Sequence, residues 1–301
     1  MRSDGWHLTH DLDDFLTRAH THMRAEPSLH TVQLTVTENL RTRGLHIYGD
    51  GAPEFGVLER GGKVRASLFR TPPFWLNLTR LTGEEADALA ALLVEQGRPL
   101  PGVNADPGTA AAFAEAWQRR TGATAMLRAR QRLYRLGTLT APEPAPPGRP
   151  RIAGEADRAQ LLCWHKEFSE AVGPGAGRDS AEWADDRIAR GDLTLWETPD
   201  GTPVAMAGLT PKVAGQIRVN AVYTPPHQRG RGYAGAVTAE VSRGAREDAG
   251  AEEVVLFTDL ANPTSNRLYQ RLGYRPVTDF ALYTFTPAGS GTGSGAGSGP
   301  Q

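Results

Sequence analysis

Apolar residues recur at helical spacing in several segments of the chain. Within 11–25, Leu12, Phe15, Leu16 and Ala19 fall on one face of a predicted helix. The same spacing predicts further helices at 81–97, 105–122, 155–172, 180–191, 237–250 and 262–273. Most of these segments begin after a polar residue and end near a glycine, as helices in globular proteins do.

Two of the predicted helices carry specific end signals. Thr82 and Glu85 have the spacing of a capping box, in which each side chain accepts a backbone N–H of the other residue. Asp106 before Pro107 gives an N-cap followed by proline at the first helical position, and Gly122 supplies the C-terminal stop.

Short apolar runs predict strands between these helices. They lie at 44–48, 63–70, 130–139, 149–154, 193–197, 203–213, 215–224, 252–260, 274–277 and 280–287. Segment 29–41 is ambiguous, because its composition favours a strand and its position favours a helix. The second half therefore reads strand, helix, helix, three strands, helix, strand, helix and two strands, which predicts an α/β (α+β) fold.

Segments rich in proline and glycine divide the chain. Residues 140–150, TAPEPAPPGRP, carry five prolines and predict a semi-extended linker. Residues 288–301 contain glycine and serine but no large apolar residue, which predicts a disordered tail. We therefore expect two domains, at 1–139 and 151–287.

Composition narrows the class of protein. The 301 residues are 39% hydrophobic and 22% charged, enough for proper cores, and the net charge of −1 gives no reason to expect a nucleic-acid or membrane partner. Cys163 is the only cysteine, so no intrachain disulfide can form, and its apolar neighbours predict a core position. Without an apolar leader or an 18-residue apolar run, we expect a cytoplasmic protein. The sequence does not indicate an oligomeric state.

Segment 227–236, HQRGRGYAGA, joins a predicted strand to a predicted helix. A helix start leaves backbone N–H groups unpaired, and the helix dipole adds partial positive charge there. Gly230 and Gly232 keep side chains away from these amides, while Arg229 and Arg231 add cationic donors. The segment predicts an anion-binding site, although an ordinary helix start with solvated arginines would also fit. No Gly-Lys-Ser/Thr follows, so the segment is not a Walker A loop.

A second motif follows the next predicted strand. Arg229-x-x-Gly232-x-Ala234 resembles the Q/R-x-x-G-x-G/A acyl-CoA signature of the GNAT (Gcn5-related) N-acetyltransferases. Segment 262–274, NPTSNRLYQRLGY, resembles their second motif, N-x-x-A/S-x-x-x-Y followed by G-F/Y. The predicted order of elements over 151–287 is also similar. Two departures are Ala234, where glycine is commoner, and a double proline at 225–226, which leaves fewer backbone donors at the strand end.

The resemblance implies an N-acyltransferase that uses acetyl-CoA as acyl donor, needs no metal, and acetylates an amine of a small molecule or peptide. A splayed pair of strands would hold the thioester, and Tyr269 would protonate the leaving thiolate. The residues implied in binding coenzyme A are Val222, Tyr223, Thr224, Arg229, Gly230, Arg231, Gly232, Tyr233, Ala234 and Asn262. By chemistry alone, Asn262 is also a good N-cap and Tyr269 a good half-buried core residue.

Acidic residues near the expected cleft offer candidates for the general base. Asp259 ends the strand before Asn262 and is the residue we assign; Glu197, His165 and Glu167 are alternatives, as is a water chain to a distant carboxylate. Cysteine and histidine do not occur at spacings typical of metal ligands or of a catalytic pair.

The first half lacks the acyl-CoA signature. If it repeats the GNAT-like fold, which we expect, it is degenerate and binds no coenzyme A. Segment 69–78, FRTPPFWLNL, could pack on the second domain or shape the acceptor site, and loop 173–180 should border that site. A non-catalytic acyl-CoA sensor is the alternative function, although it would not need a hydroxyl at Tyr269.

Overall fold

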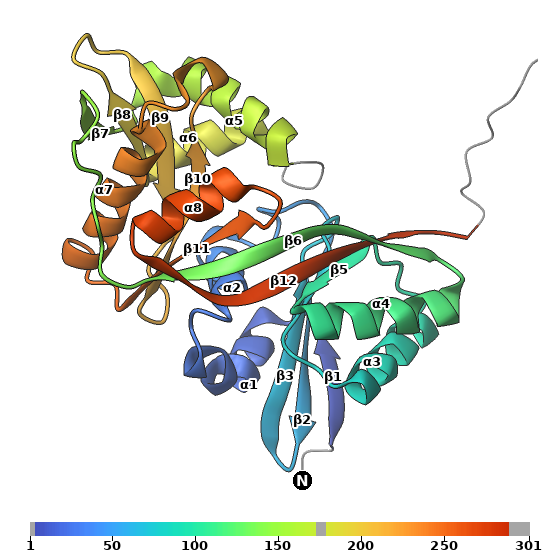
Figure 1. Ribbon diagram of the computed structural model, residues 1–301. Coiled ribbons are helices and arrows are strands. Elements are labelled where there is room, and N and C mark those ends of the chain that lie inside the picture. Colours follow the sequence, from blue (N-terminus) through green and yellow to red (C-terminus); the bar gives the residue numbers. More distant parts are fainter. Residues whose placement is uncertain (1–3, 173–178, 289–301) are drawn as a thin grey trace, which may run out of the picture.

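The computed structural model describes residues 4–172 and 179–288 (Figure 1). The predicted tail therefore lies outside the described residues except for residue 288, as does 173–178 of the loop predicted to border the acceptor site. Within the described ranges, no helix has both the length and the apolar character that a bilayer crossing requires.

The chain forms two successive sets of elements. The first set is β1 (Gly5–Thr9), α1 (Leu12–Ala25), α2 (Thr31–Arg43), β2 (Glu54–Arg60), β3 (Lys63–Arg70), β4 (Leu76–Leu78), α3 (Gly83–Glu95), β5 (Gly102–Ala105), α4 (Pro107–Thr121) and β6 (Thr124–Leu136). The second is β7 (Arg149–Ile152), η1 (Glu155–Asp157), α5 (Arg158–Val172), α6 (Ser180–Arg190), β8 (Leu193–Glu197), β9 (Pro203–Leu209), β10 (Gln216–Tyr223), η2 (Pro226–Gln228), α7 (Tyr233–Glu247), β11 (Glu253–Asp259), α8 (Pro263–Arg271) and β12 (Tyr274–Thr286). Apart from the short 3₁₀ turns, the order of the first set is repeated in the second.

All strands belong to one mixed sheet, in the order β1-β2-β3-β4-β5-β12-β6-β11-β10-β9-β8-β7. The order is symmetric about its centre, with each strand of one half matched by its counterpart in the other. The parallel pairs are β4–β5 and β10–β11, and these are counterparts. The predicted tandem repeat of a mixed, mostly antiparallel sheet flanked by helices is confirmed, and the two repeats share one sheet.

The last strand of each repeat lies in the sheet of the other repeat. β6 pairs with β11, from Gln131 opposite Asp259 to Arg135 opposite Val255. β12 pairs with β5, and β6 and β12 pair with each other from Thr124 to Leu136 (Figure 1). The boundaries 1–139 and 151–287 stay a prediction. By strand pairing, each repeat is completed by the last strand of the other.

Helices cover both faces of the sheet. In β2, Phe55 and Val57 pack with α1 and α2, whereas the next residue, Leu58, joins the core beneath α3 and α4. Successive side chains of a strand point to opposite faces, so this alternation requires an apolar layer on each side. In the second repeat, α7 covers one face, and α5 with α6 covers the other.

Several sequence predictions need correction. Segment 44–48 is a turn and not a strand, and 29–41 resolves as α2. A polar face of α2 is buried against the second repeat, where the Thr31 hydroxyl donates to Gln216 Oε1 at 2.7 Å. β1, β2, β4 and β5 were not predicted as strands, and β4 and β5, with three and four residues, are too short for a periodic pattern.

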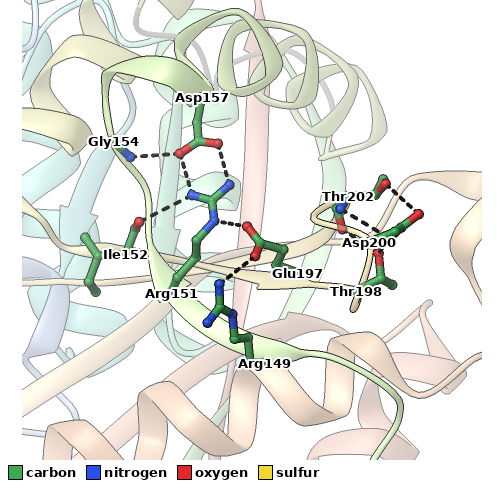
Figure 2. A network of polar contacts seen from close by, with 9 residues as sticks. All are labelled: Arg149, Arg151, Ile152, Gly154, Asp157, Glu197, Thr198, Asp200 and Thr202. Carbon is green, nitrogen blue, oxygen red and sulfur yellow. Dashed lines mark hydrogen bonds and ion pairs between the residues drawn. The ribbon is translucent and has the colours of Figure 1, made fainter.

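An ion-pair network fixes the outer edge of the second repeat (Figure 2). Arg151 of β7 donates from both Nη atoms to Asp157, at 2.6 and 2.7 Å, and from Nε to Glu197 at the end of β8. Arg149 adds a bond to Glu197 at 3.3 Å, and the amide of Gly154 donates to Asp157. Because Arg151 stabilises the charged form of Asp157, it lowers the pKa of that carboxyl below its usual range.

Candidate active site

β10 and β11 separate part-way along their length. Their parallel register runs from Gln216 opposite Glu253 to Val219 opposite Leu256 and then ends, although both strands continue. Ala221 has a left-handed φ of 48°, and the register of β10 with β9 shifts between Asn220 and Tyr223. A bulge of this kind bends a strand and increases its twist. β10 and β11 therefore separate at the place where a splayed pair of strands was expected.

Unpaired polar groups lie at the end of β10. The edge of β10 that faces β11 has no strand partner beyond Val219, although Tyr223 still pairs with Met206 on the β9 side. Thr224 Oγ1 is buried and has no hydrogen-bond partner among the described residues. A buried hydroxyl without a partner is uncommon in folded proteins. These groups suit a ligand that brings its own donors and acceptors into the gap.

The start of α7 lacks a side-chain cap. Gly232 is its N-cap in the left-handed conformation, with φ 86°, and Gly230 has φ 78°. Within the described chain, the backbone amides from Gly230 to Gly235 donate no hydrogen bond. Arg229 and Arg231 are exposed beside these amides, and Arg229 Nε donates to the carbonyl of Thr224 at 3.0 Å. Unpaired amides at a helix N-terminus are a site for an anion.

The corresponding helix start in the first repeat is closed. α3 follows β4 as α7 follows β10, but Thr82 accepts from the amide of Glu85, and the Glu85 carboxylate accepts from the amide of Thr82. Glu84 adds a further negative charge in the same turn. A helix start that is capped by its own carboxylate and carries acidic residues repels a phosphate.

Tyr269 lies on α8 and is buried in the core between α7, α8 and the sheet. Its ring meets the edge of the Tyr274 ring with 6.1 Å between centroids, and its hydroxyl bonds to no other described residue. Tyr274, by contrast, shares a 2.7 Å hydrogen bond with Ser242. Burial raises the pKa of Tyr269, so its hydroxyl stays protonated at neutral pH.

Asn262 and Asp259 shape the turn before α8. Asn262 Oδ1 caps the helix by accepting from the amide of Ser265 at 3.0 Å, and Pro263 takes the first helical position. Asp259 Oδ1 accepts from the amide of Ala261 at 2.8 Å, and the side chain is exposed at the end of β11. The Asn262 side chain thus has the structural role that helix chemistry alone predicts.

Other acidic candidates differ in where the structure places them. Glu197 lies in the arginine network near the outer edge of the sheet (Figure 2). In the strand order, β9 lies between β8, which carries Glu197, and β10. Glu167 of α5 accepts a hydrogen bond from the hydroxyl of Tyr223, at the open end of β10. Burial, and then this hydrogen bond, raise the pKa of Tyr223 to about 12. The structure therefore places Glu197 away from the gap, whereas Glu167 lies at the candidate site.

Two further side chains on α5 clarify its orientation. His165 is buried, its ring stacks on Trp183 with 4.3 Å between centroids, and its Nδ1 lies 2.9 Å from Ser180 Oγ. Cys163 is exposed, with its Sγ 3.4 Å from Glu167. The predicted core position of Cys163 is therefore wrong, because the helix face that packs on the sheet is formed by Leu161 and its neighbours.

Comparisons with known proteins decide the family of the second repeat. The model of the acetyltransferase (GNAT) family matches residues 159–274. Residues 159–274 belong to the GNAT family. This GNAT domain contains the β10–β11 gap, the uncapped start of α7, and Tyr269. No match was found among curated proteins.

Solved structures with low sequence identity share the whole fold. A Drosophila protein matches with a TM-score of 0.64 and 16% identity over 95% of this chain and 99% of its own. A GCN5-related N-acetyltransferase from Sphaerobacter thermophilus matches with a TM-score of 0.61 and 17% identity, over 95% of this chain and 97% of its own. A tandem GNAT protein from the clavulanic acid biosynthesis pathway matches with a TM-score of 0.55 and 14% identity, over 95% of this chain and 100% of its own. Together these show that the tandem fold extends beyond the GNAT domain.

A cavity of about 740 Å³ lies between the GNAT domain and the first repeat. Phe74 and Trp75, from the segment predicted to shape the acceptor site, line it together with Tyr48. The start of α6 contributes Asp179 and Glu182, and both side chains are exposed. Aromatic faces and carboxylates are the groups that bind an ammonium ion. Among the described residues, histidine, cysteine and carboxylate side chains form no cluster able to hold a metal.

Proposed function

We propose that this protein is an acyl-CoA-dependent N-acyltransferase. In this proposal it transfers an acetyl group from acetyl-CoA to a primary amine of a small molecule or peptide by direct attack in a ternary complex. The observation that carries the proposal is the run of amides from Gly230 to Gly235, which donate to no described group at the start of α7. In a GNAT domain this helix start follows the splayed strand, as it does here.

The residues present fit coenzyme A. The backbone amides of Gly230, Arg231, Gly232, Tyr233 and Ala234 would hold the diphosphate, with the side chains of Arg229 and Arg231 adding charge. Val222, Tyr223 and Thr224 would bond the pantetheine arm through open backbone groups and the unpartnered Thr224 hydroxyl. Asn262 would line the same channel from the turn before α8. Bound there, acetyl-CoA supplies the activated acyl group.

Tyr269 would donate the proton that the leaving thiolate takes up. A buried tyrosine keeps its proton at neutral pH, and its hydroxyl is not committed to another described side chain. The cavity lined by Phe74, Trp75 and Glu182 would bind the amine acceptor.

Substitution of Gly232 by tryptophan tests the donor site. The side chain should fill the space over the α7 amides, so we expect acetyl-CoA binding in the micromolar range for the wild type and none for G232W in calorimetric titration. G201W is the matched control, because Gly201 has nearly the same φ, 85° against 86°, and an added Cβ there meets nothing within 4 Å. Failure of the wild type to bind would refute the donor assignment, and binding without turnover would favour an acyl-CoA sensor.

Two carboxylates can be compared as the general base. We propose Asp259, whose exposed side chain ends β11 beside the gap; Glu167 is the competitor, held by Tyr223. D259N should lower kcat/KM for an amine by roughly 100-fold, the lower end of the usual contribution of a general base. E167Q should change kcat/KM less. The reverse ranking would move the assignment to Glu167.

A further inference from the structure

A second cavity, of about 170 Å³, lies at the junction of the two repeats. α2 of the first repeat forms one side, and α6, β9 and β10 of the second form the other. Its charged lining consists of the side chains of Arg43, Asp186, Arg187, Arg190 and Arg218. The cavity is several times larger than the ~30 Å³ that one water molecule occupies in the liquid, so it has room for a small polyatomic ion.

Three of the four arginines are neutralised by neighbouring carboxylates. Arg43 and Arg190 bind Asp186 at 2.6 and 3.1 Å. Arg190 and Arg187 bind Asp192 at 2.6 and 2.9 Å. The carboxylates of Asp186 and Asp192 therefore form ion pairs with three guanidinium groups, and neither pairs with the fourth arginine.

Arg218 is the fourth arginine, and it has no acidic partner. Its guanidinium donates to the hydroxyls of Thr35, at 3.0 Å, and Thr31, at 3.4 Å. Across the described ranges, no carboxylate lies within ion-pair distance of it. Burial lowers the pKa of Arg218 to about 10; Tyr48 opposes this shift, and the nearby Arg187 cation reinforces it. A partly buried cation satisfied only by hydroxyls is costly without a counter-charge.

We propose that this cavity binds a small oxyanion, the carboxylate or phosphate group of a ligand, with the Arg218 guanidinium as its principal partner. A planar guanidinium presents paired N–H groups that match two oxygens of such a group. Thr35 and Thr31 orient the guanidinium from α2. The site therefore takes its cation from one repeat and the groups that position that cation from the other. The proposal does not depend on the transferase function.

Thermal unfolding of the full chain tests the site, with inorganic phosphate and acetate as probes and sodium chloride at equal ionic strength as reference. At saturation by either probe, we expect the Tm of the wild type to rise by roughly 2–4 °C above the chloride reference. R218M should lose this rise. In chloride alone it should be at least as stable as the wild type, because an uncompensated cation has been removed. The probe that acts identifies the ligand group as carboxylate or phosphate.

Two control variants separate this site from other anion-binding positions. R119Q removes an exposed arginine that pairs with Asp87 on the surface of the first repeat, and it should keep the full rise. G232W blocks the α7 amides, which could themselves bind phosphate, and it should keep the rise as well. A rise that survives in R218M, or that disappears in G232W, overturns the proposal. The proposal is also overturned if neither phosphate nor acetate raises the Tm of the wild type above the chloride reference. That measurement needs only the wild type, so it decides the matter even if R218M fails to fold.

Discussion

Replacing Tyr269 with phenylalanine should lower kcat for acetyl transfer by about 100-fold or more, the range in which a general acid contributes. The acetyl-CoA affinity should stay within a few-fold, because the ring keeps its place against Tyr274 and only the hydroxyl is lost. Initial rates of thiol release give kcat, and calorimetric titration gives the affinity. Equal kcat values for Y269F and the wild type would show that the thiolate leaves without help from this residue.

Tyr274 provides a matched control for that experiment. It is also buried, and its ring contacts Tyr269, but its hydroxyl is engaged with Ser242. Y274F should therefore cost stability and leave kcat nearly unchanged. The pH profile adds a further check. Because burial raises the pKa of Tyr269, its proton should be retained throughout pH 6–10, and kcat should show no alkaline loss from this group.

Cutting the linker should leave a protein that stays together, whereas making either half alone should give no folded product. A protease site inserted near residue 143 would separate 1–139 from 151–287 after folding. Size-exclusion chromatography should then show both fragments eluting as one species, because β6 and β12 remain paired with each other and with the opposite repeat. Fragment 151–287 expressed alone should aggregate, since the edge of β11 that pairs with β6 would be exposed.

Co-expression of the two fragments supplies the complementary result. It should restore a soluble complex by exchange of the same two strands. Independent solubility and cooperative unfolding of 151–287 alone would contradict the expectation and would show that the second repeat folds without β6.

The sequence was sufficient for features that depend on near neighbours along the chain. Gly232 follows a strand and starts a helix within a few residues, so the open amides of α7 could be predicted from local chemistry. The capping box at Thr82 and Glu85 and the cap at Asn262 are equally local, and the structure confirms these contacts. For segment 29–41, the position along the chain indicated the helix that the structure shows, whereas the composition favoured a strand.

Features that depend on distant partners could not be predicted in this way. Alternation of side chains identifies β6 as a strand but does not tell which edge it joins, and the exchange of β6 and β12 followed from no local signal. The cavity lined by Trp75 and Glu182 combines side chains more than 100 positions apart. The exposed position of Cys163 was missed because α5 has apolar residues on more than one face.

The exchanged strands also govern how the chain can fold as it is synthesised. One edge of β5 stays unpaired until β12 has been synthesised, and the last residue of β12 follows β5 by about 180 positions. At ribosomal rates of roughly 5–20 residues per second, the first repeat would stay incomplete for about 10–40 s. During that interval the nascent chain presents an unpaired strand edge, which chaperones recognise and which favours aggregation. Final assembly of both repeats is therefore a single late event that follows the emergence of residue 286.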